Sequence, residues 1–206
     1  MIVAMVLVTA LPPVAAPSQP DLDRELVRRA VAGNRRAFDD LYRAHVASAH
    51  RLLTRLVGPV PERDDLIQQV FLEAYRALPG FRGDAAFTTW LHRIVVNLAY
   101  RHLRRSRRVR WEEVPDELAA PDASPELAAR RQQELAVAFG YLAALKPKKR
   151  IAYVLRVVEG LSLDEIGALV GANAPAVGQR VKHAQRELAI MVDRDRRARR
   201  TQEVSS

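Results

Sequence analysis

The segment 161–188, LSLDEIGALVGANAPAVGQRVKHAQREL, constrains the fold of this chain more strongly than any other stretch. Ser162 and Glu165 have the spacing of a capping box, so a helix is expected to begin there, and Gly171 is a suitable residue to end it. Asn173 can cap a second helix after a turn of only a few residues. The pattern therefore predicts two helices joined by a tight turn.

The second of these helices has one apolar side and one basic, polar side. The apolar residues that face inward are Val177, Val181, Ala184 and Leu188. The residues left pointing outward are Gln179, Arg180, Lys182, His183 and Arg186. A helix-turn-helix whose second helix enters the major groove of DNA has this layout. A helical hairpin whose charged side is simply solvated is the alternative.

Composition narrows the class of partner. The chain has 206 residues, a formal net charge of +9 and no cysteine. This length accommodates one large or two small domains. The positive charge favours a polyanionic partner, and both nucleic acid and an acidic membrane surface qualify. Without cysteine, disulfides, thiolate zinc sites and cysteine nucleophiles are excluded, which is compatible with a reducing cytoplasm.

Residues 1–20, MIVAMVLVTALPPVAAPSQP, differ from the rest of the chain because they are apolar and contain several prolines. The apolar run before Pro12 is too short to span a bilayer, and no Lys or Arg precedes it as in a secretory signal. We expect a disordered extension or an over-extended start site, and a weak membrane-associating tail is the third interpretation.

From residue 21 onward almost every segment has helical periodicity, and the helix expected over residues 63–78 has an unusual polar side. Its inward stripe consists of Leu66, Val70, Ala74 and Leu78. Its other sides hold Asp64, Asp65, Gln68, Gln69 and Glu73. Acids in a first turn suit the helix dipole, which explains Asp64 and Asp65 without any function. The glutamines beside them favour a docking surface for a basic partner protein.

A loop and a basic helix follow this acidic helix. The loop PGFRGD, residues 79–84, contains the proline and glycines of a turn. In the next helix Phe87 and Trp90 fall on the apolar side, so we expect core residues and not platforms for unpaired bases. Residues 101–110 hold six arginines and no acid, and phosphate is the obvious partner for such a run.

The charge reverses over residues 112–127, which hold six acids, three prolines and no base. We expect an extended, solvated linker there, and a strand that imitates nucleic acid inside a basic channel is the weaker alternative. Helices resume from Glu126, and the first two of them can form the floor on which the helix-turn-helix sits, which gives a four-helix second domain. Residues 193–206 are expected to be a basic, frayed tail.

The expected fold is all-α, with two small helical domains, residues 21–111 and 131–192, joined by a flexible acidic linker, residues 112–130. The sequence has no Gly-rich phosphate loop, no nucleophile elbow and no metal-spaced cluster. His45 and His50 lack partners at ligand spacing, so neither is expected to bind a metal. We therefore expect a binding protein and not an enzyme, with no catalytic residue, cofactor, metal or small-molecule substrate.

Two stretches carry a family resemblance. They are DDLIQQVFLEAYRALPGFRGDAAFTTWLHRIVVNLAYRHLRR and LKPKKRIAYVLRVVEGLSLDEIGALVGANAPAVGQRVKHAQREL. In this order, and joined by an acidic linker, they resemble the extracytoplasmic-function sigma factors, the minimal two-domain class of bacterial sigma subunits. The resemblance covers residues 26–192. It implies that the first domain is sigma region 2 and that the second is sigma region 4.

The resemblance also implies three binding surfaces. The beta-prime clamp helices of core RNA polymerase are expected to contact Asp64, Asp65, Gln68, Gln69 and Glu73. The promoter's minus-ten element, with a base flipped out of the stack, is expected to contact Arg82, Gly83, Asp84, Ala85, Ala86, Phe87, Arg93, Asn97, Arg101, Arg104 and Arg105. The minus-thirty-five element is expected to contact Asn173, Ala174, Pro175, Ala176, Gln179, Arg180, Lys182, His183 and Arg186.

Further expectations follow from the same resemblance. The linker would thread through the polymerase toward its active centre, and the beta flap would be a second polymerase contact. An anti-sigma factor is an expected partner, since most relatives are held inactive by one. The protein is then cytoplasmic and nucleoid-associated, or held at the membrane by that anti-sigma factor. Its role would be to direct transcription initiation in a stress or environmental response.

The start of the recognition helix departs from the family pattern. The family usually has a small or hydroxyl residue and then a basic one, where this chain has Pro175, Ala176 and Gly178. A glycine here disfavours the helix by on the order of 1 kcal/mol relative to alanine. It is also expected to remove a phosphate contact or a base reader. Upstream reading should then be weak or depend on Arg180, Lys182 and Arg186.

Two other classes of protein stay open at this point. One is a helix-turn-helix regulator that binds DNA without polymerase, although the acidic-amide helix and the linker argue against it. The other is an all-helical interaction protein that does not bind DNA and associates with membranes through its first sixteen residues. Binding to core polymerase distinguishes the first from a sigma factor, and salt-dependent DNA binding excludes the second.

Overall fold

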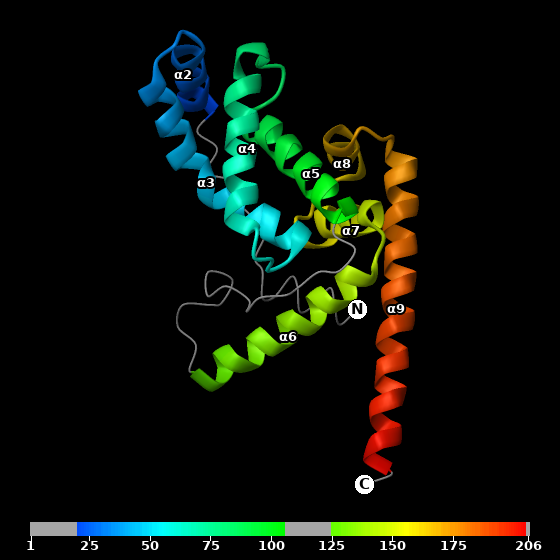
Figure 1. Cartoon of the computed structure of the whole chain (residues 1–206). Coiled ribbons are helices and arrows are strands. Elements are labelled where there is room, and N and C mark those ends of the chain that lie inside the picture. Colours follow the sequence, from blue (N-terminus) through cyan, green and yellow to red (C-terminus); the bar gives the residue numbers. More distant parts are fainter. Residues whose placement is uncertain (1–19, 106–124, 205–206) are drawn as a thin grey trace. The chain divides into compact units, whose positions relative to one another are not determined.

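The computed structural model describes residues 20–105 and 125–204, and every regular element within these ranges is a helix. The prediction of an all-α fold is confirmed. Contacts between Cα atoms divide the chain into two compact units, which hold residues 20–105 and residues 125–204 of the described part (Figure 1). None of the helices in these two ranges is both long and apolar enough to cross a membrane.

The first unit is a small bundle. Within residues 20–105 it comprises α2 (Pro20–Val31), α3 (Arg35–Val57), α4 (Arg63–Ala77), the 3-10 helix η1 (Leu78–Gly80) and α5 (Phe87–Arg105). The side chain of Asn34 caps α3 by accepting a hydrogen bond from the Ala37 amide at 3.3 Å. Gly58, with φ of 83°, ends α3 in a conformation that glycine adopts at little cost.

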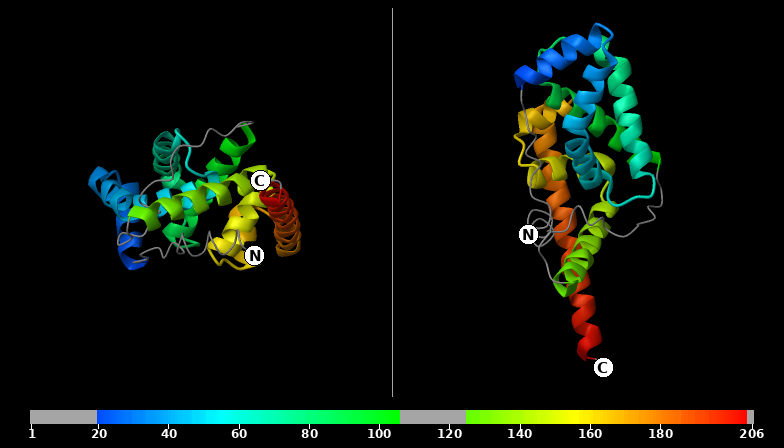
Figure 2. Two further views of the ribbon diagram at one scale, coloured as in Figure 1. Left: turned by 90° about the horizontal axis from the view of Figure 1, so that it is seen from below. Right: turned by 90° about the vertical axis from the view of Figure 1, so that its left-hand side faces the viewer.

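The core of this unit lies where α3 packs against α2, α4 and α5 (Figure 2). The inward stripe predicted for α4 is confirmed, because Leu66, Val70, Ala74 and Leu78 are all buried. On α5, Phe87 is buried and Trp90 is half-buried, which agrees with their prediction as core residues. On α2, Leu22 is 50% exposed, and its neighbour Asp23 takes the inward position.

A buried polar pair joins α2 to α3. Asp23 Oδ1 lies 2.9 Å from His45 Nε2, and the two side chains are 6% and 0% exposed. The His45 ring also packs against Phe87, with ring centroids 5.0 Å apart. Polar groups removed from water need a partner, so the pair fixes how α2 lies on α3. No sequence pattern indicated this pair, because Asp23 and His45 lie 22 residues apart on different helices.

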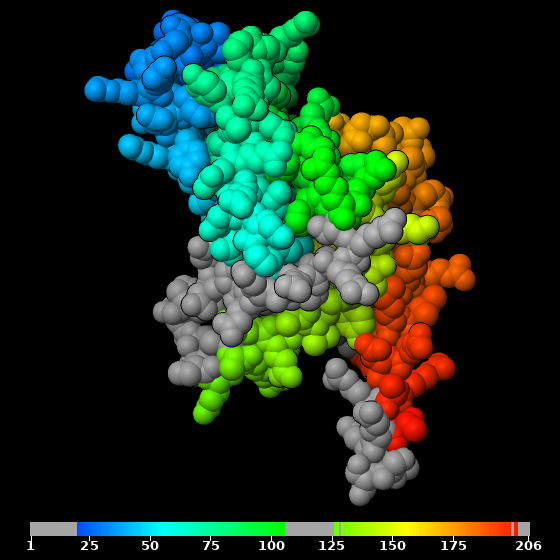
Figure 3. Space-filling view, viewed as in Figure 1, coloured from blue at the N-terminus to red at the C-terminus, as the bar shows by residue number. Residues whose placement is uncertain are grey.

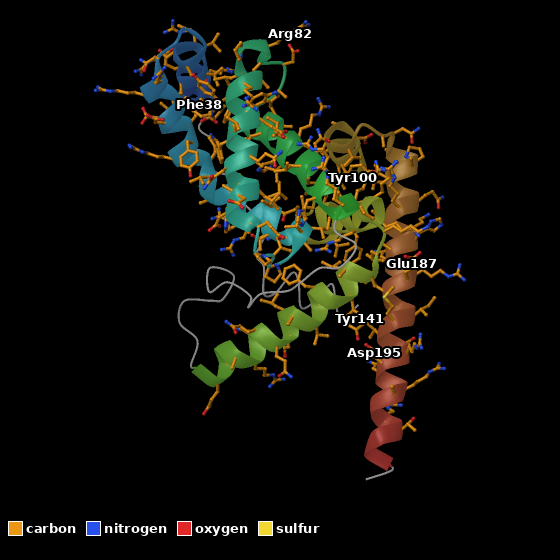
Figure 4. The ribbon with its side chains drawn as sticks, in the orientation of Figure 1. Phe38, Arg82, Tyr100, Tyr141, Glu187 and Asp195 are labelled. Atoms are coloured by element: carbon orange, nitrogen blue, oxygen red, sulfur yellow. The ribbon has the colours of Figure 1, made fainter. Side chains whose placement is uncertain are left out.

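The second unit contains the helix-turn-helix. Within residues 125–204 it comprises α6 (Pro125–Ala144), α7 (Pro147–Tyr153), the π-helical segment η3 (Val154–Val158), α8 (Leu163–Val170) and α9 (Ala174–Val204). Helix α9 packs on α7 and α8 and also contacts α6. Lys149 of α7 forms an ion pair with Glu187 of α9. The Tyr141 hydroxyl of α6 donates to Asp195 Oδ2 of α9 at 2.7 Å (Figure 4).

The predicted caps of the helix-turn-helix are confirmed. Ser162 Oγ accepts from the Glu165 amide at 3.2 Å, and Glu165 Oε2 accepts from the Ser162 amide at 2.7 Å. Gly171 ends α8 in the left-handed conformation, with φ of 63°. Asn173 Oδ1 then accepts from the Ala176 amide at 2.9 Å and caps α9. The turn is therefore fixed by local hydrogen bonds.

Two glycines inside this motif have different surroundings. A Cβ atom on Gly167 of α8 would lie 2.5 Å from the carbonyl oxygen of Ala172, which belongs to the backbone of the turn. A Cβ atom on Gly178 of α9 would lie 3.4 Å from Leu163 Cδ1, an ordinary van der Waals contact. Gly167 is therefore required for the close approach of α8 to the turn, whereas Gly178 is not sterically required.

The helix predicted to resume at Glu126 is confirmed, since α6 begins at Pro125, and both a proline and the acidic Glu126 suit a first helical turn. Residues 125–130, which we also counted in the linker, therefore belong to α6. The predicted end of the last helix was wrong. Helix α9 continues to Val204, so most of the predicted frayed tail is helical as well (Figures 1 and 2). That stretch contains neither glycine nor proline, and its arginines are good helix formers. The predicted N-terminal extension and most of the predicted linker lie outside the described residues.

We predict that Asp23→Ala lowers the free energy of unfolding of the first unit by about 1–3 kcal/mol, because His45 loses its partner in a buried site. Urea unfolding followed by circular dichroism measures this change. Asp21→Ala is the matched control, since Asp21 is an exposed acid on the same helix whose contact with Arg24 is weak. Equal effects of the two substitutions would contradict a structural role for the buried pair.

The two glycines of the helix-turn-helix give a second prediction. Gly167→Ala should destabilise the second unit by about 1–3 kcal/mol. The new methyl group would overlap the backbone carbonyl oxygen of Ala172, and relieving that overlap requires a shift of the turn or of α8. Gly178→Ala should stabilise it by up to about 1 kcal/mol through higher helix propensity. The same unfolding measurement tests both substitutions. If both changed the free energy of unfolding in the same direction, the described contact between Gly167 and the turn would be wrong.

Candidate functional site

The acidic and amide residues predicted on one helix lie on the outside of α4. Asp64, Asp65, Gln68 and Gln69 are exposed, and Glu73 is half-buried. Asp64 is engaged within the unit, since its Oδ1 lies 3.4 Å from Arg63 Nε and 3.7 Å from His50 Nε2. The Asp65 carboxylate has no such partner among the described residues. Asp65 is therefore better placed than Asp64 to bind a partner.

Apolar side chains extend this polar surface. Leu72 and Tyr75 are 47% and 49% exposed. The Tyr75 ring lies edge-on to Phe38 of α3, with centroids 4.9 Å apart, and Tyr42 of α3 is 40% exposed beside Phe71. Leu72 and Tyr75 were not among the predicted polymerase contacts, although both fall outside the inward stripe of α4. Figure 3 shows α4, in teal, forming much of the open surface of this unit.

We name the α4 docking surface by its exposed members Asp65, Gln68, Gln69, Leu72 and Tyr75. These residues follow one another at steps of three, one, three and three, so they lie along one side of the helix. An exposed apolar patch bordered by acids and amides is typical of a protein–protein interface. The arrangement can hold a partner that presents basic and apolar side chains.

A row of basic side chains runs along the outer face of α5. Arg93, Asn97, Arg101 and Arg104 are exposed and lie at steps of four, four and three, which places them on one side of the helix. We name these four residues the α5 basic row. Arg105 is exposed next to the end of this row, and the Arg104 guanidinium lies 5.7 Å from the centroid of the Tyr100 ring. The row can hold several phosphates in succession.

The loop before α5 presents a second set of predicted residues. Arg82, Gly83, Asp84, Ala85 and Ala86 are all exposed, and Arg82 lies at the outer end of the unit (Figure 4). Gly83 has φ of 76°, which a side chain would make unfavourable.

Phe87, predicted with this set, is only 4% exposed, so it supports the loop from below. Its ring packs with Phe81 and Trp90 at centroid distances of 6.1 and 5.5 Å.

A hollow of about 90 Å³ lies between α2 and this loop. It is lined by Pro20, Asp23, Arg24, Val27, Phe81, Gly83, Ala85, Ala86 and Phe87. Aromatic and small apolar groups form most of its wall, and the carboxyl group of Asp23 and the guanidinium-bearing Arg24 are its charged members. A small cleft with apolar walls and few polar groups suits part of a planar, aromatic ligand.

One buried histidine influences the charge of α5. Burial lowers the pKa of His92 to about 4, and the neighbouring His45 lowers it further as a secondary cause. The lowering means that the neutral ring is favoured in the folded protein. His92 is therefore neutral at neutral pH, and the positive charge of α5 lies on its outer side.

The outer face of α9 carries the residues predicted to contact DNA. Pro175, Gln179, Lys182 and Arg186 are exposed at steps of four, three and four and form one stripe, which we name the α9 reading stripe. Ala174, Ala176 and Arg180 are half-buried at its border, His183 is exposed there, and Asn173 uses its side chain as the cap. Gly178 is half-buried next to Leu163 of α8, and its expected effect on a phosphate contact or a base reader stays a prediction.

The described residues thus offer three surfaces for binding. Within residues 20–105 and 125–204, no group of three or more histidine, cysteine, aspartate or glutamate side chains is arranged to hold a metal ion. The α4 docking surface is acidic and apolar, the α5 basic row is cationic, and the α9 reading stripe is polar and basic. The first fits a protein, and the other two fit nucleic acid.

Family models match a part of each of the two units. Residues 41–109 match Sigma-70 region 2, and residues 140–188 match Sigma-70, region 4. The RNA polymerase sigma-H factor of Pseudomonas aeruginosa is 36% identical over 178 residues, which covers 79% of this chain and 90% of the relative. The ECF RNA polymerase sigma-E factor of Escherichia coli strain K12 is 34% identical over 176 residues, with the same two coverages.

Solved structures show the same fold. CnrH in complex with the cytosolic domain of CnrY is 32% identical, has a TM-score of 0.62, and the match covers 84% of this chain and 99% of CnrH. The sigma factor RpoE of Bartonella quintana, solved with the anti-sigma factor NepR, has a TM-score of 0.56 at 19% identity, with 76% and 96% coverage. The chain therefore belongs to the sigma-70 family of RNA polymerase sigma factors, in its extracytoplasmic-function group.

Proposed function

We propose that this protein is a dissociable initiation subunit that binds core RNA polymerase, recognises two elements of a promoter and helps to open the duplex between them. The observation that carries this assignment is the pairing, in one chain, of an acidic and apolar docking surface with two separate DNA-facing surfaces. A stand-alone regulator would need the helix-turn-helix but not the α4 docking surface. The protein then acts by binding, without catalysing a reaction of its own.

The α4 docking surface is the proposed site for the clamp helices of the polymerase. Asp65 supplies an uncompensated charge, Gln68 and Gln69 supply amide groups, and Leu72 and Tyr75 supply apolar area. Such a patch combines steering by charge with burial of apolar surface. Asp64 is assigned a different role, since its contacts with Arg63 and His50 tie α4 to its surroundings.

The loop and the α5 basic row are the proposed site for the opened minus-ten element. The row holds phosphates of the displaced strand, and the hollow beside the loop accepts an extruded base between apolar walls. A protein that binds the splayed strand and not the closed duplex offsets the cost of unstacking, which is a few kcal/mol per base. Promoter opening then follows from selective binding of the single strand.

The α9 reading stripe is the proposed site for the minus-thirty-five element. Gln179, Lys182 and Arg186 lie along it and can reach base edges in a major groove. The Ala176 amide is occupied by the cap at Asn173 and Pro175 has no amide hydrogen, so the positive end of the α9 dipole is what suits a phosphate there. Reading of this element is assigned to the middle of the stripe, because Pro175 at its start cannot donate a hydrogen bond from its backbone.

The parts of the chain are assigned accordingly. We take residues 21–111 as the polymerase and minus-ten domain, residues 112–130 as the connection, with its last residues folded into α6, and residues 131–192 as the minus-thirty-five domain. An anti-sigma factor is proposed as a further partner, as in the RpoE complex with NepR. A cytoplasmic, nucleoid-associated location and a role in a stress or environmental response complete the proposal.

The α4 docking surface predicts a selective loss of polymerase binding. Leu72→Ala should raise the dissociation constant for core polymerase by about 5- to 10-fold, because it removes apolar area from the centre of the patch. Leu22→Ala is the control, since Leu22 is exposed to a similar extent on α2, outside the surface. Titration of fluorescently labelled full-length protein with core enzyme gives both constants. Indistinguishable values for the two variants would refute the assignment of α4.

The two DNA surfaces predict different defects in transcription. Arg104→Ala should lower promoter opening at all promoters, since phosphate contacts carry no sequence information. Gln179→Ala should change the preference among upstream sequences and leave opening largely intact. In vitro transcription with core polymerase on a library of genomic fragments measures both.

Arg130→Ala on α6 controls for loss of charge in that assay. Normal transcription by both test variants would show that the DNA surfaces are wrongly assigned.

A further inference from the structure

Glu73 belongs to two neighbourhoods at once. Its Oε1 atom accepts a hydrogen bond from Gln69 Nε2, one turn earlier on α4, at 3.2 Å, and another from Arg101 Nη2 on α5 at 2.5 Å. Gln69 is part of the α4 docking surface, and Arg101 is part of the α5 basic row. A single carboxylate oxygen thus connects the surface proposed for polymerase with the surface proposed for DNA.

Arg101 differs from its basic neighbours on α5 because a carboxylate holds it. Within residues 20–105 and 125–204, no carboxylate pairs with Arg104 or Arg105. The contact with Glu73 neutralises the Arg101 guanidinium and occupies a donor that a phosphate would need. In this state the α5 basic row is interrupted at its third position.

The Glu73–Arg101 pair is weak enough to be exchanged. The side chains remain 43% exposed for Arg101 and 32% exposed for Glu73, so water screens their attraction. Partly exposed pairs of this kind contribute little to stability. A partner that offers Glu73 a new donor can therefore separate it from Arg101, whereas a fully buried pair would resist such exchange.

We propose that Glu73 is an internal competitor that occupies Arg101 in the free protein and releases it when core polymerase binds α4. This inference rests on the proposed function of both surfaces. A basic partner surface that docks over Gln69 meets Glu73 on the same helix, and the carboxylate turns to it. Arg101 then binds a phosphate of the promoter strand. Docking on one helix thereby raises the DNA affinity of the next one, so the free subunit binds DNA less well than the assembled enzyme.

The opposite role for Glu73 makes the opposite prediction. If Glu73 served only to orient Arg101 toward DNA, its removal would free the arginine side chain to sample other rotamers and would weaken DNA binding. If Glu73 competes with DNA, its removal strengthens DNA binding. The sign of one change in affinity therefore decides between positioning and competition.

The first test uses the free full-length protein and a fluorescein-labelled single-stranded DNA of random sequence, about 12 nucleotides long, followed by anisotropy at low salt. Glu73→Gln should bind this probe about 2- to 5-fold more tightly than the wild type. The gain should vanish in the double variant Glu73→Gln with Arg101→Ala. Arg101→Ala alone should weaken binding less than 2-fold, roughly, because that arginine is already occupied.

A matched control separates competition from a general change of charge. Glu25→Gln also removes one negative charge from an exposed pair, that of Glu25 with Arg28 on α2, and should leave the affinity for the probe unchanged. An equal gain in Glu25→Gln, or in the double variant, would overturn the proposal, because the effect would then not pass through Arg101. Unchanged or weaker binding by Glu73→Gln would overturn it as well.

The second test uses the complex of the protein with core polymerase. The DNA is a fluorescein-labelled forked duplex whose single-stranded arm is the strand used in the first test. Arg101→Ala should weaken binding at least 3-fold more in this complex than in the free protein, roughly, since docking has released the arginine. An equal effect in both states would overturn the proposed release. Failure of the wild-type protein to bind core polymerase would instead refute the proposed function itself, so the two failures are distinguishable.

Discussion

Each of the three proposed binding surfaces is the outer side of a helix whose inner side is buried, and this constraint shapes both units. Helix α4 buries Leu66, Val70 and Ala74, so the helix cannot rotate about its axis and the direction of the α4 docking surface is fixed. Helix α9 buries Val177 and Ala184, which fixes the reading stripe in the same way. A helix can bury its apolar stripe at only one rotation about its axis. Burial of that stripe therefore fixes the direction of the polar side chains on the opposite side, although these contribute little to stability themselves.

The loop beside α5 is positioned by a different device. It contains no regular element of its own between η1 and α5, and its exposed residues make few contacts. Its position is set by Phe81 and Phe87, whose rings pack together with Trp90. Beneath Phe87 lies His45, held by Asp23 of α2. Helix α2 therefore supports the loop end of the unit, and it also forms one wall of the hollow beside the loop.

Electrostatics connects surfaces that packing keeps separate. Glu73 shares one oxygen between Gln69 and Arg101, so the charge state of α5 depends on what α4 contacts. Burial keeps His92 neutral and leaves cations only on the outer side of α5. In the second unit, the hydrogen bond from Tyr141 to Asp195 and the Lys149–Glu187 pair hold α9 against α6 and α7. These contacts are few and partly exposed, so they bias the arrangement of surfaces and contribute modestly to stability.

The sequence by itself determined the helices, their caps and their polar faces. The capping box at Ser162, the turn at Gly171 and the inward stripe of α4 depend on residues a few positions apart, whose geometry the backbone of a helix imposes. It also indicated the family, because two characteristic stretches occur in the right order.

Only the tertiary structure decided which residues from different helices meet. The Asp23–His45 pair and the Glu73–Arg101 contact arise between segments far apart in the chain, and no periodicity within one helix encodes them. The end of α9 was misplaced because composition alone does not separate a charged helix from a charged tail.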